Sequence, residues 1–238
     1  DRRHRRLRFG RVLSLMHKTV AVIGHVDHGK TSLVKALTGK NTDALKEEQS
    51  RGLSIVLGFA SYQTSAGRLH FIDAPGHADF IQTAASGLSG ADAVLLVLSS
   101  VDGISAQTIE HLKLAYLLGI ERAVVAMTKS DLVSQHEPKT TYNDVANLMM
   151  DCGFQGAPIV TCSSQTGDGL EALKDTLAEL AREQVERPQL PGFFLPVDRV
   201  FSVQGAGTVV TGTLLGNAIN IGDAAHVEPK RIDRTVRG

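Results

Sequence analysis

A phosphate-loop pattern constrains the fold of this chain more than any other feature. Residues 24–31 (Gly-His-Val-Asp-His-Gly-Lys-Thr) have the spacing G-x-x-x-x-G-K-[ST], directly after an apolar run at residues 19–23 and before a helix-like run at residues 32–37. Glycines at both ends let the backbone curl so that successive N–H groups point at anionic oxygens. This order of strand, loop and helix predicts a site for the phosphates of a nucleotide.

The side chains of this loop have separate expected roles. Lys30 is placed to reach the β- and γ-phosphates, and the hydroxyl of Thr31 is placed to bind Mg²⁺. The other expected nucleotide contacts lie in the loop and the first helical turn: Gly24, His25, Val26, Asp27, His28, Gly29 and Ser32.

Residues 128–131 (Thr-Lys-Ser-Asp) follow a second apolar run, residues 123–127, and indicate the base. A carboxylate accepts hydrogen bonds and does not donate them, so Asp131 can take both the ring N–H and the exocyclic amine of guanine, whereas adenine presents an acceptor in place of that N–H. The pattern favours GTP over ATP, with Thr128 and Lys129 as further contacts. In isolation, Lys-Ser-Asp would be interpreted as an ordinary solvated turn.

A third apolar run, residues 158–162, leads into Ser163 and Ser164. This position would allow backbone N–H groups to meet the guanine oxygen, although the segment alone is weak support for a nucleotide site.

Residues 73–77 (Asp-Ala-Pro-Gly-His) close a strand expected at residues 69–72. We expect Asp73 to hold Mg²⁺ through water, and the N–H group of Gly76 to contact the γ-phosphate. His77 then falls where an attacking water must be oriented. The alternative interpretation is a surface or packing histidine beside a helix start.

Together these elements resemble the translational GTPases related to elongation factor Tu. The resemblance rests on residues 24–31, 51–55 (Arg-Gly-Leu-Ser-Ile), 73–77 and 101–108 (Val-Asp-Gly-Ile-Ser-Ala-Gln-Thr).

Three details are similar to the selenocysteine-specific elongation factors. They are residues 51–60, the use of Thr-Lys-Ser-Asp in place of the commoner Asn-Lys-x-Asp, and residues 196–213, which look like the start of that family's second domain. The γ subunit of initiation factor 2 shares part of the first pattern. That subunit usually carries a cysteine-rich zinc element, for which Cys152 and Cys162 are too few.

The resemblance also implies roles that the spacing alone does not. Ser54 stands where the family has a threonine that binds Mg²⁺ only in the GTP state, and Val26 with Leu53 would form an apolar gate beside His77. An aminoacyl pocket is implied in the second domain, at Asp198, Arg199 and Arg237. The alternative for Asp198 and Arg199 is a surface turn pair of little energetic value.

The implied function is GTP-dependent delivery of selenocysteinyl-tRNA to the ribosome, with hydrolysis of GTP to GDP and phosphate. The expected cofactors are GTP/GDP and Mg²⁺. Two alternatives stay open: another aminoacyl-tRNA carrier, similar to elongation factor Tu or the γ subunit of initiation factor 2, or a regulatory GTPase fragment that does not bind tRNA. Neither a membrane nor DNA is an expected partner.

Composition agrees with a globular chain in a reducing, cytoplasmic compartment. The chain is 42% apolar and 21% charged, with two cysteines, and no apolar run approaches the roughly 20 residues that span a bilayer. Residues 1–15 hold six arginines and one aspartate, which leaves 19 basic and 24 acidic residues in the rest. This segment is interpreted either as a nucleic-acid-binding arm or, preferably, as an incidental extension without a defined role.

The predicted organisation has three parts. Residues 1–15 form a disordered basic extension, residues 16–186 a GTP-binding α/β domain, and residues 187–238 a partial β-barrel with too few strands to close. Alternating strands and helices predict a doubly wound, mostly parallel sheet with its ligand at the carboxyl ends of the strands. We expect a hairpin at 54–64 and 68–73, a strand at 93–99, helices at 107–118, 142–152 and 170–185, and later strands at 193–203, 207–215 and 221–227.

Overall fold

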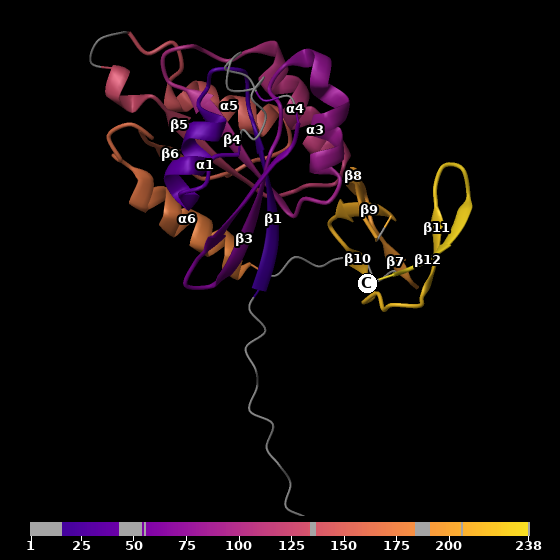
Figure 1. The fold of residues 1–238 in the computed structure, drawn as a ribbon. Coiled ribbons are helices and arrows are strands. Elements are labelled where there is room, and N and C mark those ends of the chain that lie inside the picture. Colours follow the sequence, from indigo (N-terminus) through magenta and orange to yellow (C-terminus); the bar gives the residue numbers. More distant parts are fainter. Residues whose placement is uncertain are drawn as a thin grey trace, which may run out of the picture.

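A six-stranded sheet forms the centre of the first domain (Figure 1). The computed structural model describes residues 16–42, 54, 56–133, 137–183, 191–205 and 207–237. Within them the strand order is β2-β3-β1-β4-β5-β6, and β2 alone pairs antiparallel to its neighbour. The strands are β1 (Met16–Ile23), β2 (Gly58–Gln63), β3 (Gly67–Asp73), β4 (Ala93–Ser99), β5 (Ala123–Thr128) and β6 (Ile159–Thr161).

Helices cover both faces of this sheet. The α-helices are α1 (Lys30–Thr38), α3 (Ile81–Leu88), α4 (Ala106–Leu117), α5 (Tyr142–Asp151) and α6 (Leu170–Arg182). Two short 3₁₀ turns, η1 (Ala78–Phe80) and η2 (Ser130–Leu132), follow β3 and β5. Apolar side chains of α1 and α6 share one core cluster, and those of α3, α4 and α5 share the other. The predicted doubly wound α/β fold is confirmed.

The central strand β4 shows why this segment forms a sheet interior. All of its residues are buried, and they alternate between the two clusters: Val94, Leu96 and Leu98 face one set of helices, while Leu95 and Val97 face the other. A parallel strand covered on both faces has a continuous apolar sequence because neither face meets water.

The predicted hairpin is also confirmed, with a later start. Strand β2 pairs with β3 from Gly58 opposite Asp73 to Gln63 opposite Arg68. The hydroxyl of Thr64 closes the turn by donating to the Gly67 carbonyl at 2.8 Å. Pairing begins at Gly58 and not at residue 54 as expected, and Gly58 packs directly against the side chain of Thr42.

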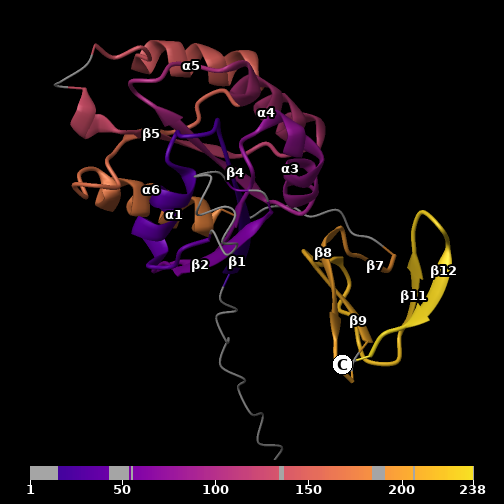
Figure 2. The same ribbon diagram turned by 45° about the horizontal axis from the view of Figure 1, so that its top comes forward.

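Residues 191–237 form three antiparallel strand pairs, in agreement with the expected partial barrel (Figure 2). The pairs are β7 (Phe193–Phe194) with β10 (Leu215–Gly216), β8 (Val197–Val203) with β9 (Gly207–Gly212), and β11 (Ala224–Val227) with β12 (Ile232–Thr235). Strand β12 was not anticipated. Apolar side chains such as Phe194, Val200 and Val210 are exposed on these pairs.

Two predicted features lie outside the described residues: the segment 1–15 and the domain boundary at 186/187. Across the described parts of the chain, no helix has the length and apolar character needed to cross a membrane.

Candidate functional site

The loop between β1 and α1 has the backbone geometry of an anion cradle. Gly24, Asp27 and Gly29 have φ angles of 142°, 63° and 88°. A Cβ on Gly24 would collide with the carbonyl of Val97, and Gly29 is the N-cap of α1. Glycine tolerates positive φ without steric cost, so the loop can turn its N–H groups inward at the positive end of the helix.

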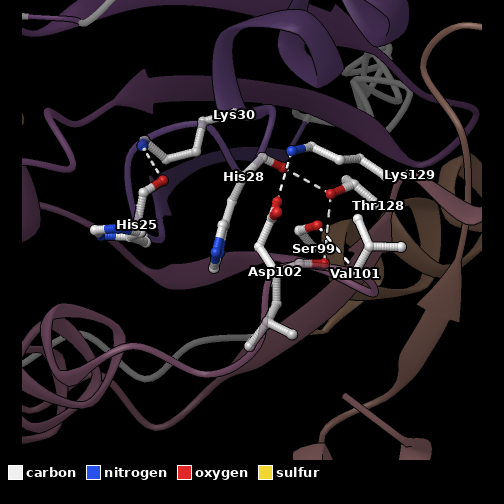
Figure 3. A network of polar contacts seen from close by, with 9 residues as sticks. His25, His28, Lys30, Ser99, Val101, Asp102, Thr128 and Lys129 are labelled. Atoms are coloured by element: carbon white, nitrogen blue, oxygen red, sulfur yellow. Dashed lines mark hydrogen bonds and ion pairs between the residues drawn. The ribbon is translucent and has the colours of Figure 1, made fainter. Parts of the chain in front are cut away.

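Lys30 spans this loop. Its side chain is buried, and Nζ donates to the carbonyl oxygen of His25 at 2.9 Å (Figure 3). The segment after β3 crosses the same place, because a Cβ on Gly76 would lie 2.7 Å from the carbonyl oxygen of Gly24 and against Lys30 Nζ. Only a glycine fits there, so the loop predicted to sense the γ-phosphate lies directly on the phosphate cradle.

The three predicted Mg²⁺ ligands meet beside this cradle. Thr31 Oγ1 donates to Asp73 Oδ2 at 2.9 Å and lies 3.3 Å from Ser54 Oγ. Sequence reasoning missed Thr42, whose buried hydroxyl donates to the same Asp73 oxygen at 2.6 Å. No spacing rule identifies Thr42, because it lies in a loop outside every motif. Two hydroxyls and a carboxylate are hard oxygen donors of the type Mg²⁺ takes, so the residues present fit that ion.

The predicted base-reading loop follows β5 and is tied to the phosphate loop. Thr128 Oγ1 donates to the carbonyl oxygen of His28 at 2.6 Å, and Lys129 Nζ donates to Asp102 Oδ2 at 2.6 Å (Figure 3). Asp131 lies two residues further on, in η2. These contacts bring the two motifs into one site, although about a hundred residues separate them in the sequence.

Ser163 shapes the third loop of the site. The residue is buried, and its hydroxyl accepts hydrogen bonds from the N–H groups of Gln165 at 3.1 Å and Thr166 at 3.2 Å. The N–H of Ser130 donates to the carbonyl of Cys162 at 3.3 Å, which joins this loop to the base-reading loop.

A cavity of about 590 Å³ unites these loops. This volume lies within the range of small-ligand sites, about 300–1,000 Å³. The predicted contacts that line it are Val26, Asp27, Gly29, Lys30, Thr31, Ser32, Ser54, Gly76, Thr128, Lys129, Asp131, Ser163 and Ser164. The predicted residues that do not line it are Gly24, His25, His28, Asp73 and His77.

The side chain of His77 lies away from the cavity. Its Nδ1 accepts a hydrogen bond from the N–H of Asp79 at 3.3 Å and lies 3.4 Å from the Asp79 carboxylate, and 44% of the side chain is exposed. Its expected role with an attacking water stays a prediction. Val26 of the predicted gate lines the cavity, and Leu53 lies outside the described residues.

A layer of histidines underlies the phosphate loop. His28 and His111 are each 1% exposed, and His25 Nδ1 contacts Gln107 Oε1. Burial, together with the neighbouring His25 and Lys30, lowers the pKa of His28 from 6.5 to about 4, against a smaller opposing effect of Asp102. Burial is also the main cause that lowers the pKa of His111 to about 4. Both imidazoles are therefore neutral at pH 7 and act as packing groups.

The predicted aminoacyl-pocket residues divide between two places. Asp198 Oδ1 accepts from Thr211 Oγ1 at 2.6 Å and lies 3.9 Å from Arg199 Nε. The guanidinium carbon of Arg199 lies 3.9 Å from the ring centroid of Phe59 on β2. Arg237 is exposed after β12, and among the described residues no hydrogen bond or ion pair joins it to the other two.

Known proteins are similar to this chain in both sequence and fold. Residues 15–183 match the family model of the elongation factor Tu GTP-binding domain. The selenocysteine-specific elongation factor of Desulfomicrobium baculatum is 46% identical over 216 residues, which are 90% of this chain and 34% of that protein. The protein of the same name from Escherichia coli (strain K12) is 40% identical over 206 residues, 86% of this chain and 33% of that protein.

A solved structure agrees with these relatives. The crystal structure of a bacterial selenocysteine-specific elongation factor superposes with a TM-score of 0.81 at 36% identity, over 94% of this chain and 38% of that chain. The chain thus spans about a third of the length of the curated relatives described.

Proposed function

We propose that this chain, which belongs to the family of elongation factor Tu GTP-binding domains, binds GTP and GDP and hydrolyses GTP as part of a selenocysteine-specific translation factor. The observation that carries the proposal is the single cavity in which Lys30, Thr31 and Asp131 meet. A phosphate cradle and a base-reading carboxylate in one cavity suit a guanine nucleotide and not a phosphate alone.

Each of these residues has a binding role in the proposal. The ammonium group of Lys30 and the N–H groups of the phosphate loop stabilise the β- and γ-phosphates, while Asp131 accepts both guanine donors. Thr31, Ser54 and Asp73 would hold Mg²⁺, which when bound neutralises charge on the phosphates.

Hydrolysis in this site is mainly a matter of position and charge. A water oxygen attacks the γ-phosphorus, the bond from that phosphorus to the β–γ bridging oxygen breaks, and GDP and inorganic phosphate leave. Lys30 stabilises the charge that develops on the bridging oxygen, and Gly76 contacts the γ-phosphate through its N–H. His77 orients the water after its side chain turns toward the cavity, and Val26 with Leu53 restricts that movement.

The carrier function rests on the similarity to proteins named as selenocysteine-specific elongation factors. In this proposal the cytoplasmic GTP form delivers selenocysteinyl-tRNA to the ribosome. Asp198 and Arg199, with Arg237, recognise the side chain, since a selenol is largely anionic at neutral pH and a serine hydroxyl is not. An arginine can therefore distinguish the two by charge.

Filter binding with selenocysteinyl-tRNA and seryl-tRNA tests the carrier function. The measurement is made with GTP and with GDP, on this chain and on the full-length protein. The proposal expects GTP-dependent retention of selenocysteinyl-tRNA over seryl-tRNA by the full-length protein. Equal retention of both tRNAs would instead favour a general aminoacyl-tRNA carrier. No retention, with intact nucleotide binding, would favour a regulatory GTPase.

A further inference from the structure

An ion pair joins the base-reading loop to the loop that follows β4. Lys129 Nζ lies 2.6 Å from Asp102 Oδ2, and the two side chains are 29% and 43% exposed. They follow the neighbouring strands β4 and β5, and the N–H of Ser100 donates to the carbonyl of Thr128 at 3.0 Å, which joins the two strand ends. Both charged groups are therefore fixed by adjacent carboxyl ends of the sheet.

The backbone of Lys129 has a left-handed conformation. Its φ angle is 58°, in the left-handed region that is sterically unfavourable for a residue with a Cβ. The residue lies between Thr128, which is tied to the carbonyl of His28, and Ser130, which is tied to the carbonyl of Cys162. Lys129 lines the cavity with Asp131, whereas Asp102 does not line it.

Asp102 keeps its charge in this setting. Burial opposes ionisation, but hydrogen bonds from Lys129 and Ser99 outweigh it and lower the pKa of the carboxyl below 3.8. The group is thus a fixed anion at neutral pH, and it faces the ammonium group of a residue that lines the nucleotide cavity.

We propose that Asp102 is a positioning residue for guanine-nucleotide binding: it acts through Lys129 to hold the base-reading loop in its binding conformation and slows nucleotide dissociation. The inference rests on the guanine-nucleotide binding of the proposed function. Without the carboxylate, the Lys129 ammonium group loses its anchor, and the left-handed backbone beside Asp131 loses a restraint. We expect equal effects on GTP and GDP, because the anchor acts on the loop that carries Asp131, and the two nucleotides share the guanine base that this loop is proposed to bind.

The test is nucleotide dissociation from the full-length protein, measured by stopped-flow with fluorescent GDP and GTP analogues. For Asp102→Asn we expect dissociation of both analogues to accelerate about 3- to 10-fold, the range for a partly exposed, charge-assisted contact. Asp102→Glu, which retains the charge, should release both analogues more slowly than Asp102→Asn does. In a Lys129→Met background, Asp102→Asn should produce no further change, because the partner through which it acts is absent.

Salt separates this role from a general loss of structure. Added KCl should accelerate dissociation from the unmodified protein and have less effect on Asp102→Asn, since screening weakens an ion pair that the variant lacks. Glu171→Gln is the matched control: Glu171 forms a 2.7 Å ion pair with Lys174 on α6, away from the cavity, and its loss should leave dissociation unchanged.

The outcomes separate this inference from the proposed function. If the unmodified protein binds guanine nucleotides but Asp102→Asn releases them at the same rate, only the role of Asp102 is refuted. The same conclusion follows if Asp102→Asn adds its full effect in the Lys129→Met background. If the unmodified protein does not bind these nucleotides, the proposed function and the role of Asp102 are both refuted.

Discussion

A hydroxyl group joins the two halves of the nucleotide site in this chain. The commoner motif has asparagine at this position, whereas Thr128 reaches the carbonyl oxygen of His28 with its Oγ1 at 2.6 Å. A buried hydroxyl bond to a carbonyl contributes about 1 kcal/mol, and more is lost if the carbonyl is left without a partner. At the scale of single residues, the link between the predicted base-reading loop and the phosphate loop therefore depends on a short polar bond.

Asp131→Asn should convert guanine preference toward xanthine. The asparagine amide presents a donor to the donors of guanine, whereas xanthine has a carbonyl in place of the exocyclic amine. Two lost bonds to a charged acceptor predict at least about a 100-fold weaker affinity for GDP. Competition against a fluorescent nucleotide, with GDP, XDP and ADP, measures the change. If ADP displaces the label as well as GDP from the unmodified protein, the guanine assignment is wrong.

Ser54→Ala should weaken GTP-dependent steps and spare GDP. Ser54 Oγ lies 3.3 Å from Thr31 Oγ1, so its hydroxyl can join a metal site there, and its segment is expected to respond to the γ-phosphate. Affinity for GDP and for a non-hydrolysable GTP analogue should be compared at fixed Mg²⁺, with Ser164→Ala as a hydroxyl control at the base end. An equal loss of both affinities would contradict the switch role of Ser54.

His77→Ala should reduce ribosome-stimulated hydrolysis by two orders of magnitude or more, because catalysis of phosphoryl transfer depends on positioning the nucleophile. Nucleotide affinity should not change, since His77 does not line the cavity. Single-turnover hydrolysis on ribosomes measures the rate, and Asp79→Asn tests whether the carboxylate near Nδ1 holds the imidazole away from the cavity. An unchanged rate in His77→Ala would remove the residue from the mechanism.

At the scale of elements, α4 and the phosphate loop share a layer of neutral histidines. His28 comes from the loop and His111 from α4, and for both rings burial is the main cause of a pKa of about 4. Among the described residues, no hydrogen bond reaches Nδ1 of His111. Protonation of these rings would place charge near Lys30, which already lowers both pKa values.

Folding stability should therefore fall as the pH drops below 6.5. The unfolded chain binds protons at its histidines near pH 6.5, whereas the folded chain resists until about pH 4, so acid favours unfolding. Each histidine contributes a loss of up to about 1.4 kcal/mol per pH unit in this window. Urea unfolding at pH 7 and pH 5 should show a smaller difference for His111→Leu. An undiminished difference in His111→Leu would contradict the prediction.

Elements with strong local signals could be predicted from the sequence. Helix α4 begins after Ser105, whose hydroxyl accepts from the N–H of Thr108, and it ends before Gly119 at a φ of 82°. The sequence pattern did not predict helix α3, because its small residues and Gly87 give a weak signal. Gly87 packs closely against methyl groups of Leu57 and Ile72. Only tertiary contacts reveal Thr42, Asp102 and the start of β2.

At the scale of the whole molecule, the first strands of the second domain lie against the nucleotide-binding domain. Ser86 Oγ on α3 donates to the carbonyl of Val197 at 3.4 Å, and Arg199 covers Phe59. The family resemblance implied a candidate pocket role for Arg199, and the structure adds a cation–π contact worth about 0.5–1 kcal/mol at a partly exposed site. The same arginine thus has one role in domain contact and a proposed role in recognition.

Arg199→Ala in the full-length protein should reduce the ratio of selenocysteinyl-tRNA to seryl-tRNA affinity about 10- to 100-fold, as expected for loss of a hydrogen bond to a charged group. Phe59→Leu keeps the arginine and removes the ring beneath it, so it separates recognition from domain contact. Equilibrium binding of both tRNAs gives the ratio. An intact ratio in Arg199→Ala would place the pocket elsewhere.

Among the strands that the structure describes, β2 has a sheet neighbour on one side only, since β3 pairs with it and it ends the strand order. Its amide hydrogens should therefore exchange with solvent before those of β1 and β4, which have neighbours on both sides. Local opening of this strand would release the segment that carries Ser54 while β1, β4 and β5 keep their pairing. The predicted switch at Ser54 could then operate without disturbing the loops that line the cavity.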